Sequence, residues 1–445
     1  MEREAADWCI AARWVIPVEP AQAVYEDCAV VVRDGRILAL CPASEVDRRF
    51  RCAQRVELSH HLVTPGLVNA HGHAAMTLLR GVADDLDLDT WLRRHIWPLE
   101  ARFVDADFVR DGTRLAAAEM IRGGTTCFAD QYFFPEEVAA VAREAGLRAQ
   151  VGFPVIEVAT AWARDGEACL HRGLELHDAL RGDPLLSVAF APHAVHTVAE
   201  PLLERIAVLA AEVDGRIHIH LHETAAEVAA WERRRGERPL ATLDRLGLLG
   251  ETTQCVHMVA LDEADLELLA ERRPGVVHCP RSNLKLGSGI CPLLSLLERN
   301  LAVGLGTDGA ASNNSLDLLA EMQLAALLAK GTSGDAAALD AHRALRLATL
   351  DGARVLGLAE ETGSLEPGKS ADLAAFDLSG LAQQPLHHPL SALAYTTTAS
   401  SRASHVWVAG RALLVDGALT TLDEGEIAAS ARFWRRRLAT AEAEW

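Results

Sequence analysis

Two histidines separated by one residue end a hydrophobic run, TPGLVNAHGH, that spans residues 64–73. Residues i and i+2 of a β-strand point to the same side, so the imidazoles of His71 and His73 can reach one metal ion. Later apolar segments also end close to a histidine or an aspartate: His193 in APHAVHT, His220 in RIHIHLHE, His257 in QCVH and Asp308 in AVGLGTD. Imidazoles and a carboxylate gathered at strand ends are what a catalytic metal site on a parallel β/α barrel requires.

The third histidine ligand is left open by strand periodicity. His218, His220 and His222 all fall on one face of the same expected strand, and position at its carboxyl end favours His220 or His222. Glu223 follows immediately and can act as an acid or base over the site. Asp308, at the end of the last expected strand, can bind the ion and also accept a proton from the attacking water.

The scarcity of lysine limits the number of metal ions. Many barrel hydrolases hold two metals bridged by a carboxylated lysine from a middle strand, but this chain has no lysine between His73 and Lys285. We therefore expect one divalent metal ion per subunit, with zinc as the first choice and Fe²⁺ or Mn²⁺ as alternatives. Other zinc motifs fail: Ala226 stands where HExxH needs its second histidine, and the chain has no CxxC pair.

Composition excludes several kinds of partner. The chain has 445 residues, half of them hydrophobic, and a formal charge of −19, which argues against binding to nucleic acid or to an anionic membrane. No apolar run reaches the length of a membrane span, and the segment MEREAADWCIAAR has no hydrophobic signal-peptide region. We expect a cytoplasmic globular protein whose nine cysteines are reduced.

The order of expected strands and helices predicts the fold class, an α/β protein with a (β/α)8 TIM-like barrel. From about Val63 strands alternate with helices, each helix reaching a glycine near its end. Eight such units over roughly 250–300 residues suit this barrel. The expected strands are LVTPGLVNAH, TTCFAD, RAQVGFPV, LLSVAFAPH, RIHIHLHE, TQCVHMV, GVVHCP and LAVGLGTD.

Short strands without intervening helices lie at both chain ends. A hairpin is predicted at Asp34-Gly35, and strands return after about Gly363. We predict that residues 1–63 and 363–445 form one small β-sandwich, closed by a terminal helix from Glu426 through Ala443, and that residues 64–362 form the metal-dependent catalytic barrel.

An ordered set of motifs resembles the amidohydrolase superfamily, in its branch of mononuclear aminohydrolases related to chlorohydrolases. The resemblance covers nearly the whole chain and is carried by TPGLVNAHGH, HLHET, CVH, HCPRSNLKLGSG, GTDGAAS and GSLEPGKSADL. Within that branch, GVADDLDLDTWLRRHIWPLE is similar to the corresponding segment of the 5′-methylthioadenosine/S-adenosylhomocysteine deaminases.

The resemblance implies a role for each candidate residue. The implied metal ligands are His71, His73, His220 and Asp308. Glu223 is the implied proton shuttle, and His257 polarises the attacking water. His193 matches a contact to the purine, and Glu100, in WPLE, matches the carboxylate that holds the ribose hydroxyls.

The implied function is hydrolytic deamination of an adenine nucleoside, namely 5′-methylthioadenosine, S-adenosylhomocysteine or adenosine, to the inosine analogue and ammonia. The alternatives on the same barrel are a deaminase of a free base or pterin, such as guanine or 8-oxoguanine, and a triazine hydrolase. A non-catalytic scaffold is a third reading, but the intact ligand set argues against it. The expected partner is a small purine nucleoside, and a homo-oligomer is compatible with the resemblance.

Overall fold

The computed structural model describes residues 3–396 and 402–442. The chain forms two units, each with its own internal contacts. Unit 1 comprises Met1–Asn69, Ala118–Cys127 and Asp317–Leu422, and unit 2 comprises Ala70–Ala117, Phe128–Leu316 and Asp423–Trp445.

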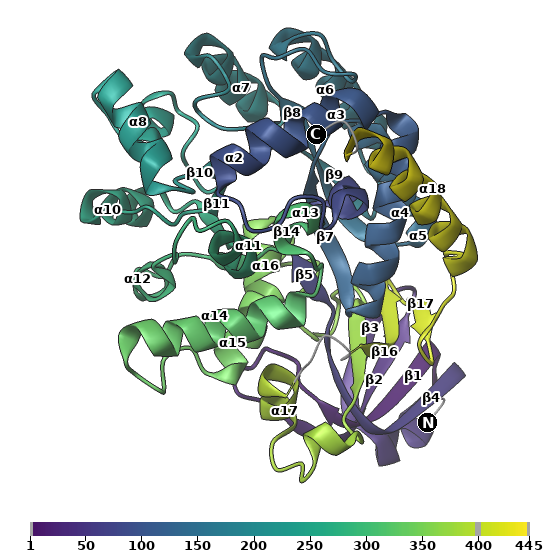
Figure 1. The fold of residues 1–445 in the computed structure, drawn as a ribbon. Coiled ribbons are helices and arrows are strands. Elements are labelled where there is room, and N and C mark those ends of the chain that lie inside the picture. Colours follow the sequence, from purple (N-terminus) through teal and green to yellow (C-terminus); the bar gives the residue numbers. More distant parts are fainter. Residues whose placement is uncertain (1–2, 397–401, 443–445) are drawn as a thin grey trace. The chain divides into compact units, whose positions relative to one another are not determined.

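Unit 1 contains an eight-stranded sheet built from both ends of the chain, with the order β18-β17-β16-β15-β4-β1-β2-β3. Figure 1 shows the purple strands of the N-terminal segment beside the yellow-green strands of the C-terminal segment. The two groups join where β15 runs antiparallel to β4, with Leu373 opposite Pro65. The strands are β1 Glu4–Val15, β2 Tyr25–Arg33, β3 Arg36–Pro42, β4 Phe50–Pro65, β15 Leu373–Asp377, β16 Ala403–Val408, β17 Arg411–Val415 and β18 Ala418–Leu419. The prediction that both chain ends share one β-structure is confirmed.

Alternation along β1 explains why both faces of this sheet are buried. Ile10 packs in one apolar cluster with Trp407, whereas Cys9 packs in another with Val31, because successive side chains point to opposite faces. The hairpin predicted at Asp34-Gly35 is present between β2 and β3. Both turn residues have positive φ, 51° and 74°, as a two-residue hairpin turn of type I′ requires.

A second eight-stranded sheet has the order β13-β12-β11-β10-β9-β8-β7-β5, and the pairs from β8 to β13 are parallel. Its strands are β5 Leu67–Asn69, β7 Thr125–Gln131, β8 Arg148–Val155, β9 Leu186–Pro192, β10 Arg216–Leu221, β11 Thr253–His257, β12 Gly275–His278 and β13 Val303–Leu305. Every residue of β7 and β8 is buried, as expected for parallel strands covered on both faces. The eight predicted barrel strands and the (β/α)8 fold class are confirmed.

A short parallel pair, β6 Gly72–His73 with β14 Asp308–Gly309, follows the first and last of these strands. It sets Asp308 opposite Gly72 and Gly309 opposite His73. In the predicted run LVTPGLVNAH, β4 ends at Pro65 and β5 begins at Leu67. Gly66 lies between them because a Cβ there would come within 2.6 Å of three side-chain atoms of Thr126.

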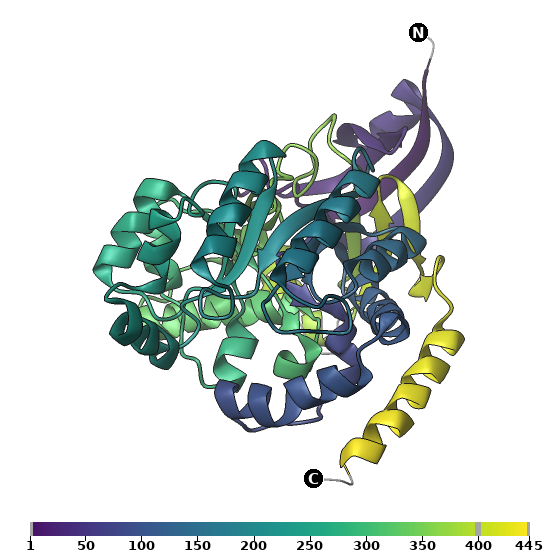
Figure 2. The same ribbon diagram turned by 90° about the horizontal axis from the view of Figure 1, so that it is seen from above.

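Helices surround the strands of unit 2, and Figure 2 shows them from above together with the yellow C-terminal helix α18. Helix α5 ends at Gly146 and α8 at Gly236, both with positive φ, as the sequence predicts for helix ends. The helices that precede β10 are η1 Ala43–Glu45, α1 Val46–Arg49, η2 Ala74–Leu79, α2 Leu88–Trp91, η3 Leu92–Ile96, α3 Trp97–Phe103, α4 Ala106–Arg122, α5 Pro135–Ala145, α6 Gly166–Leu180 and α7 Glu200–Glu212. The later ones are α8 Ala225–Arg235, α9 Pro239–Arg245, α10 Glu263–Arg272, α11 Pro280–Lys285, α12 Leu293–Glu298, α13 Ala310–Asn313, α14 Leu318–Ser333, α15 Ala341–Leu347, α16 Leu350–Val355, η4 Leu381–Gln383, α17 Pro389–Tyr395 and α18 Glu424–Glu442.

The terminal helix predicted from Glu426 through Ala443 is confirmed as α18, although Ala443 itself lies outside the described residues. Trp434 anchors it in unit 2, because its ring packs edge-on against Phe108 with centroids 5.1 Å apart. Its indole Nε1 donates a hydrogen bond to Oδ2 of Asp111 at 2.8 Å. Within the described part of the chain, no helix has both the length and the apolar character needed to span a membrane.

Candidate metal centre

Four side chains of unit 2 converge at the carboxyl ends of the barrel strands. One ligand atom from each of His71, His73, His220 and Asp308 lies within 4.8 Å of the others. Oδ1 of Asp308 is 3.3 Å from Nε2 of His71 and 3.2 Å from Nε2 of His73. The sequence therefore predicted a group of residues that the fold does bring together.

The structure separates the three histidines that periodicity left open. His220, near the end of β10, joins the group. His218 lies two residues earlier in the strand, and its Nε2 is hydrogen-bonded to Nδ1 of His71 instead. His222 lies beyond the strand, where its ring bonds to the backbone of Leu240 and Ala260.

Hydrogen bonds on the far side of two rings fix how those rings face the centre. Nδ1 of His73 lies 2.6 Å from the carbonyl oxygen of Gln131, and Nδ1 of His220 lies 2.9 Å from that of His193. A carbonyl oxygen only accepts, so each Nδ1 carries a hydrogen. Both rings therefore turn Nε2 toward the centre, and the neutral form of each ring has its electron pair on that nitrogen.

Asp308 is held in a similar way. Its Oδ2 accepts hydrogen bonds from the hydroxyls of Ser282 at 2.6 Å and Ser312 at 2.8 Å. Oδ1 is left to face the histidines. Burial alone would raise the pKa of this carboxyl, but His71 and His73 beside it hold the pKa well below its usual range. The carboxylate is therefore anionic.

These residues fit a divalent cation. Nε2 of His71 is fully buried and has no hydrogen-bond partner among the described residues. Burying a polar nitrogen without a hydrogen-bond partner costs free energy, unless another group such as a metal ion binds it. Three imidazoles and one carboxylate are the donor set that zinc accepts, and Fe²⁺ or Mn²⁺ also take these ligands.

Backbone strain marks the same strand ends. His257, the last residue of β11, has φ of 76°, and Asp308 has φ of 58°. Positive φ is uncommon for residues other than glycine and tends to persist where the surroundings over-determine the conformation, as at active sites. The fold thus turns both side chains at the point where each strand ends.

Glu223 and His257 lie close to each other, and the His257 ring is 5.5 Å from that of His220. Oε2 of Glu223 lies 3.8 Å from Nε2 of His257, and the hydroxyl of Ser288 is 3.4 Å from Oε1. Burial raises the pKa of Glu223, with His257 opposing the shift. Nδ1 of His257 donates a hydrogen bond to Oδ1 of Asn283 at 2.9 Å, which leaves Nε2 facing Glu223.

Glu100 and His193 lie around this centre. Oε1 of Glu100 accepts a hydrogen bond from the phenol of Tyr132 at 2.7 Å, and the Tyr132 ring is 6.2 Å from that of His73. Burial raises the pKa of Glu100 to about 7, and the Tyr132 hydroxyl opposes the shift. The His193 ring is 5.2 Å from that of His220, and burial lowers its pKa to about 3, so it is neutral.

Sequence reasoning missed two of these partners. Tyr132 directly follows β7, and Ser312 lies in α13, four residues after Asp308. Position just beyond a barrel strand could have drawn attention to Tyr132. Ser312 ends the motif GTDGAAS, but no role was expected for it, and only the path of the chain shows that its hydroxyl reaches the carboxylate.

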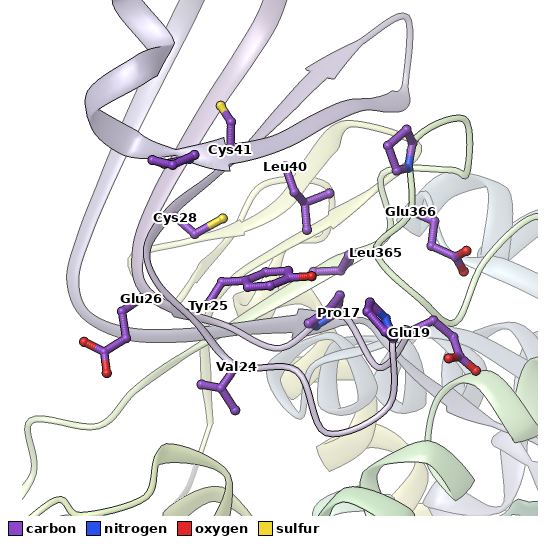
Figure 3. Close-up of a pocket in the computed structure, with 13 residues that line it drawn as sticks. Pro17, Glu19, Val24, Tyr25, Glu26, Cys28, Leu40, Cys41, Leu365 and Glu366 are labelled. Atoms are coloured by element: carbon purple, nitrogen blue, oxygen red, sulfur yellow. The ribbon is translucent and has the colours of Figure 1, made fainter.

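A separate hollow of about 810 Å³ lies within unit 1 (Figure 3). Tyr25 lies among proline and leucine side chains there. The carboxylates on its wall are already paired: Glu19 with Arg346, Glu26 with Arg13, and Glu366 with Ser364. This lining lacks the histidine-rich set that hydrolysis on a metal requires, so the chemistry belongs to the centre in unit 2.

A parallel barrel with three histidines and an aspartate at its carboxyl end defines a class of metal-dependent barrel proteins. The family model described as "Amidohydrolase family" matches residues 62–413, and this chain belongs to that family. It is 50% identical, over 97% of its length and 98% of the relative's, to a 5-methylthioadenosine/S-adenosylhomocysteine deaminase of Teredinibacter turnerae.

Solved structures agree with the fold. An adenosine deaminase from Xanthomonas campestris with bound zinc is 49% identical to this chain, with a TM-score of 0.96, and the match covers 99% of this chain and all of that one. An atrazine chlorohydrolase from Arthrobacter aurescens, complexed with zinc, is 24% identical, with a TM-score of 0.89 over 96% and 99% of the two chains. The second likeness bears on the fold alone.

Proposed function

We propose that this protein is a mononuclear metal-dependent aminohydrolase that deaminates an adenine nucleoside, namely 5′-methylthioadenosine, S-adenosylhomocysteine or adenosine, to the inosine analogue and ammonia. The observation that carries the proposal is the ligand group of His71, His73, His220 and Asp308 with the Glu223–His257 pair beside it. The names of the relatives at about 50% identity support the nucleoside substrate.

The three histidines and Asp308 would hold one divalent ion per subunit, and zinc is the ion bound in the solved relative. Such an ion, when bound, lowers the pKa of a water molecule toward neutrality and so supplies a nucleophile at physiological pH. The remaining steps are carried by side chains of this chain.

Two carboxyl groups, Asp308 and Glu223, carry out the proton transfers. Asp308 accepts one proton from the water whose oxygen attacks C6 of the adenine ring, and His257 orients that oxygen through its Nε2. Glu223, whose pKa is raised by burial, donates its proton to ring N1 and so removes the aromatic resistance to attack. The adduct then carries a hydroxyl and an amino group on C6.

Collapse of the adduct returns both residues to their starting states. Glu223 takes the hydroxyl proton as the C6–O double bond forms, and Asp308 delivers its proton to the amino nitrogen. The C6–N bond breaks, ammonia leaves, and the purine keeps the proton on N1. Glu223 ends the cycle protonated and Asp308 ends it ionised, as each began.

Two residues are assigned to substrate recognition. Glu100 accepts hydrogen bonds from the ribose hydroxyls, supported by its position beside Tyr132 near the ligand group. His193, neutral and next to His220, contacts the purine ring. A free base lacks the ribose hydroxyls and should therefore react poorly.

The runner-up function is deamination of a free base or pterin, such as guanine or 8-oxoguanine, or hydrolysis of a triazine on the same barrel. The test is loss of the adenine ultraviolet chromophore with ammonia release, on zinc-loaded protein. The panel is methylthioadenosine, S-adenosylhomocysteine, adenosine, adenine and guanine. Rapid turnover of nucleosides with little action on bases is the expected result. Turnover of a base with none of a nucleoside would favour the runner-up.

The domains, the cellular location and the assembly of the protein are also part of the proposal. Residues 1–63 and 363–445 form the non-catalytic domain and residues 64–362 the catalytic one, which expression of the parts would test. The described cysteines are all free thiols, which supports a cytoplasmic location. A homo-oligomer is the proposed assembly, and light scattering on the purified protein would measure it.

A further inference from the structure

A row of three buried side chains runs behind the metal centre. Nδ1 of His71 lies 2.7 Å from Nε2 of His218, and Nδ1 of His218 lies 2.6 Å from Oε1 of Gln254. His71 and Gln254 have no exposed surface and His218 is 2% exposed. The register of β10 with β11 sets His218 opposite Gln254, so strand pairing itself holds the second bond in place.

The two imidazoles meet edge to edge. Their planes are inclined by only 19° and their centroids are 5.0 Å apart, although two of their nitrogens are 2.7 Å apart. Rings stacked face to face would bring their centroids closer together at that nitrogen distance. The contact is therefore a hydrogen bond that lies close to both ring planes, which is the favourable geometry.

The position of every hydrogen in this row follows from the role of His71 as a ligand. If Nε2 of His71 offers its lone pair to a metal ion, the ring hydrogen must be on Nδ1. That hydrogen is donated to Nε2 of His218, which must be unprotonated, so His218 carries its own hydrogen on Nδ1. Gln254 must then present its carbonyl oxygen, because only an acceptor can meet that hydrogen.

The other two histidine ligands do not depend on side chains in this way. His73 and His220 donate to the backbone carbonyls of Gln131 and His193, which no substitution removes. His71 alone of the three has its tautomer set by a side chain. It also has a competing tautomer, because a hydrogen on Nε2 could be donated to Oδ1 of Asp308, 3.3 Å away. That bond would occupy both the nitrogen and the carboxylate oxygen that the metal needs.

We propose that His218, supported by Gln254, is a positioning residue that holds His71 in the metal-binding tautomer. In this tautomer Nε2 of His71 has no hydrogen to donate to Asp308. The inference rests on the proposed metal-dependent function and deepens it. It assigns a role to a histidine that strand periodicity places on the same face as the expected ligand. Partners that orient a ligating histidine typically change metal affinity by about 10- to 100-fold when they are lost.

The test is zinc affinity, measured by competition with a chromophoric chelator, on the full-length protein and three variants. His218→Phe removes the acceptor but keeps a flat ring of similar size. His218→Gln places an amide oxygen where Nε2 stood and so restores the acceptor. His222→Phe is the matched control, because His222 is equally buried and follows the same strand, but bonds to the backbone of Leu240 and Ala260.

The expected result is a zinc affinity lowered by about 10- to 100-fold in His218→Phe, largely restored in His218→Gln, and close to that of the wild type in His222→Phe. The visible absorption of the cobalt-loaded protein should change in His218→Phe and return in His218→Gln, which loss of folded protein alone would not produce. Thermal midpoints of all variants are recorded alongside.

Three outcomes would overturn the inference while leaving the proposed function intact. In the first, His218→Phe binds zinc as tightly as the wild type. In the second, His218→Gln is as weak as His218→Phe, and in the third His222→Phe loses as much affinity as His218→Phe, which would indicate general damage to the barrel. A wild-type protein that binds no divalent cation would overturn the proposed function, and this inference with it. The two failures are thus distinguishable.

Discussion

Oδ1 of Asp308 lies 3.2 Å from Nε2 of His73, which sets this carboxylate inside the ligand group rather than beside it. The pairing of β14 with β6 produces the contact, because it aligns Gly309 with His73 at the seam between the last and first strand ends. The same carboxylate has its other oxygen fixed by two serine hydroxyls. One residue can therefore bind the ion and receive a proton without changing its orientation.

Replacing Asp308 by asparagine should abolish turnover. The amide keeps the shape but loses both the negative charge and the capacity to accept the water proton, and loss of a general base alone costs about 100- to 10,000-fold. Ammonia release from the preferred nucleoside measures the effect. Ser312→Ala is the matched comparison, since it removes one hydrogen bond to Oδ2 and leaves the carboxylate, and should lose far less. Near-wild-type activity of Asp308→Asn would contradict the proposed mechanism.

The Glu223→Gln variant should separate proton transfer from metal binding. Glu223 lies outside the ligand group, so the zinc content should stay near one ion per chain, whereas kcat should fall by about 100- to 10,000-fold. Metal analysis and steady-state kinetics on the same preparation check both halves. If zinc were lost together with activity, the assignment of Glu223 as a proton shuttle outside the ligand set would be wrong.

Asn283 should matter through His257. Its Oδ1 accepts the Nδ1 hydrogen of His257 at 2.9 Å and so leaves Nε2 free to orient the attacking water. Asn283→Leu should lower kcat by about 10- to 100-fold, in line with the roughly 1–3 kcal/mol cost of an unmet buried polar group. Asn283→Asp keeps the acceptor and should recover much of the rate. Equal losses in the two variants would indicate that packing, not the tautomer of His257, is at stake.

Much of this arrangement could be predicted from the sequence because parallel strands bring their carboxyl ends together. Hydrophobic runs that end on His71, His257 or Asp308 are enough to place those residues at one end of a barrel. The motif context then assigns roles to them. Local pattern and topology agree in this part of the chain, so the strands themselves could be predicted with their approximate ends.

Periodicity could not tell His218, His220 and His222 apart, since all three share one face of a strand in an alternating pattern. What separates them is where β10 ends and which residues of β11 lie opposite, and neither is encoded in local spacing. The partners of the ligands are harder still. The hydroxyl of Tyr132 donates to Glu100, which comes from another segment of the chain, and that of Ser312 reaches Asp308, four residues earlier, only because α13 turns the chain back toward it.

Removing the metal should destabilise the protein. A ligand that binds only the folded state adds about 2.7 kcal/mol of stability when its concentration is 100 times its dissociation constant. Treatment with a chelator should therefore lower the thermal midpoint, and added zinc should restore it. The Asp308→Asn variant, which lacks a charged ligand, serves as control and should respond less to the chelator. If the chelator left the thermal midpoint of a zinc-containing wild-type sample unchanged, the ligand assignment would be contradicted.

The pH dependence of stability should reveal Glu100. Burial raises the pKa of this carboxyl from 4.5 to about 7 in the folded protein, with the Tyr132 hydroxyl opposing the shift. The folded state then binds the proton more tightly than the unfolded chain. The stability that this provides is fully present below pH 4.5 and is lost as the pH rises through 7. Glu100→Gln, which mimics the protonated form, should lack this loss, so its unfolding curves should diverge from those of the wild type between these two pH values.

The same titration should appear in catalysis, because only the ionised carboxylate can accept hydrogen bonds from both ribose hydroxyls. The ratio of kcat/KM for a nucleoside between wild type and Glu100→Gln should therefore rise with pH through about 7. Above that pH the variant should be about 10- to 100-fold slower, as expected for the roughly 1.5–3 kcal/mol of a hydrogen bond to a charged group. Taking the ratio removes the titration of Glu223, which both proteins share. A ratio that is flat across pH 5–9 would mean that Glu100 does not hold the ribose, and the nucleoside specificity would then have to come from other residues.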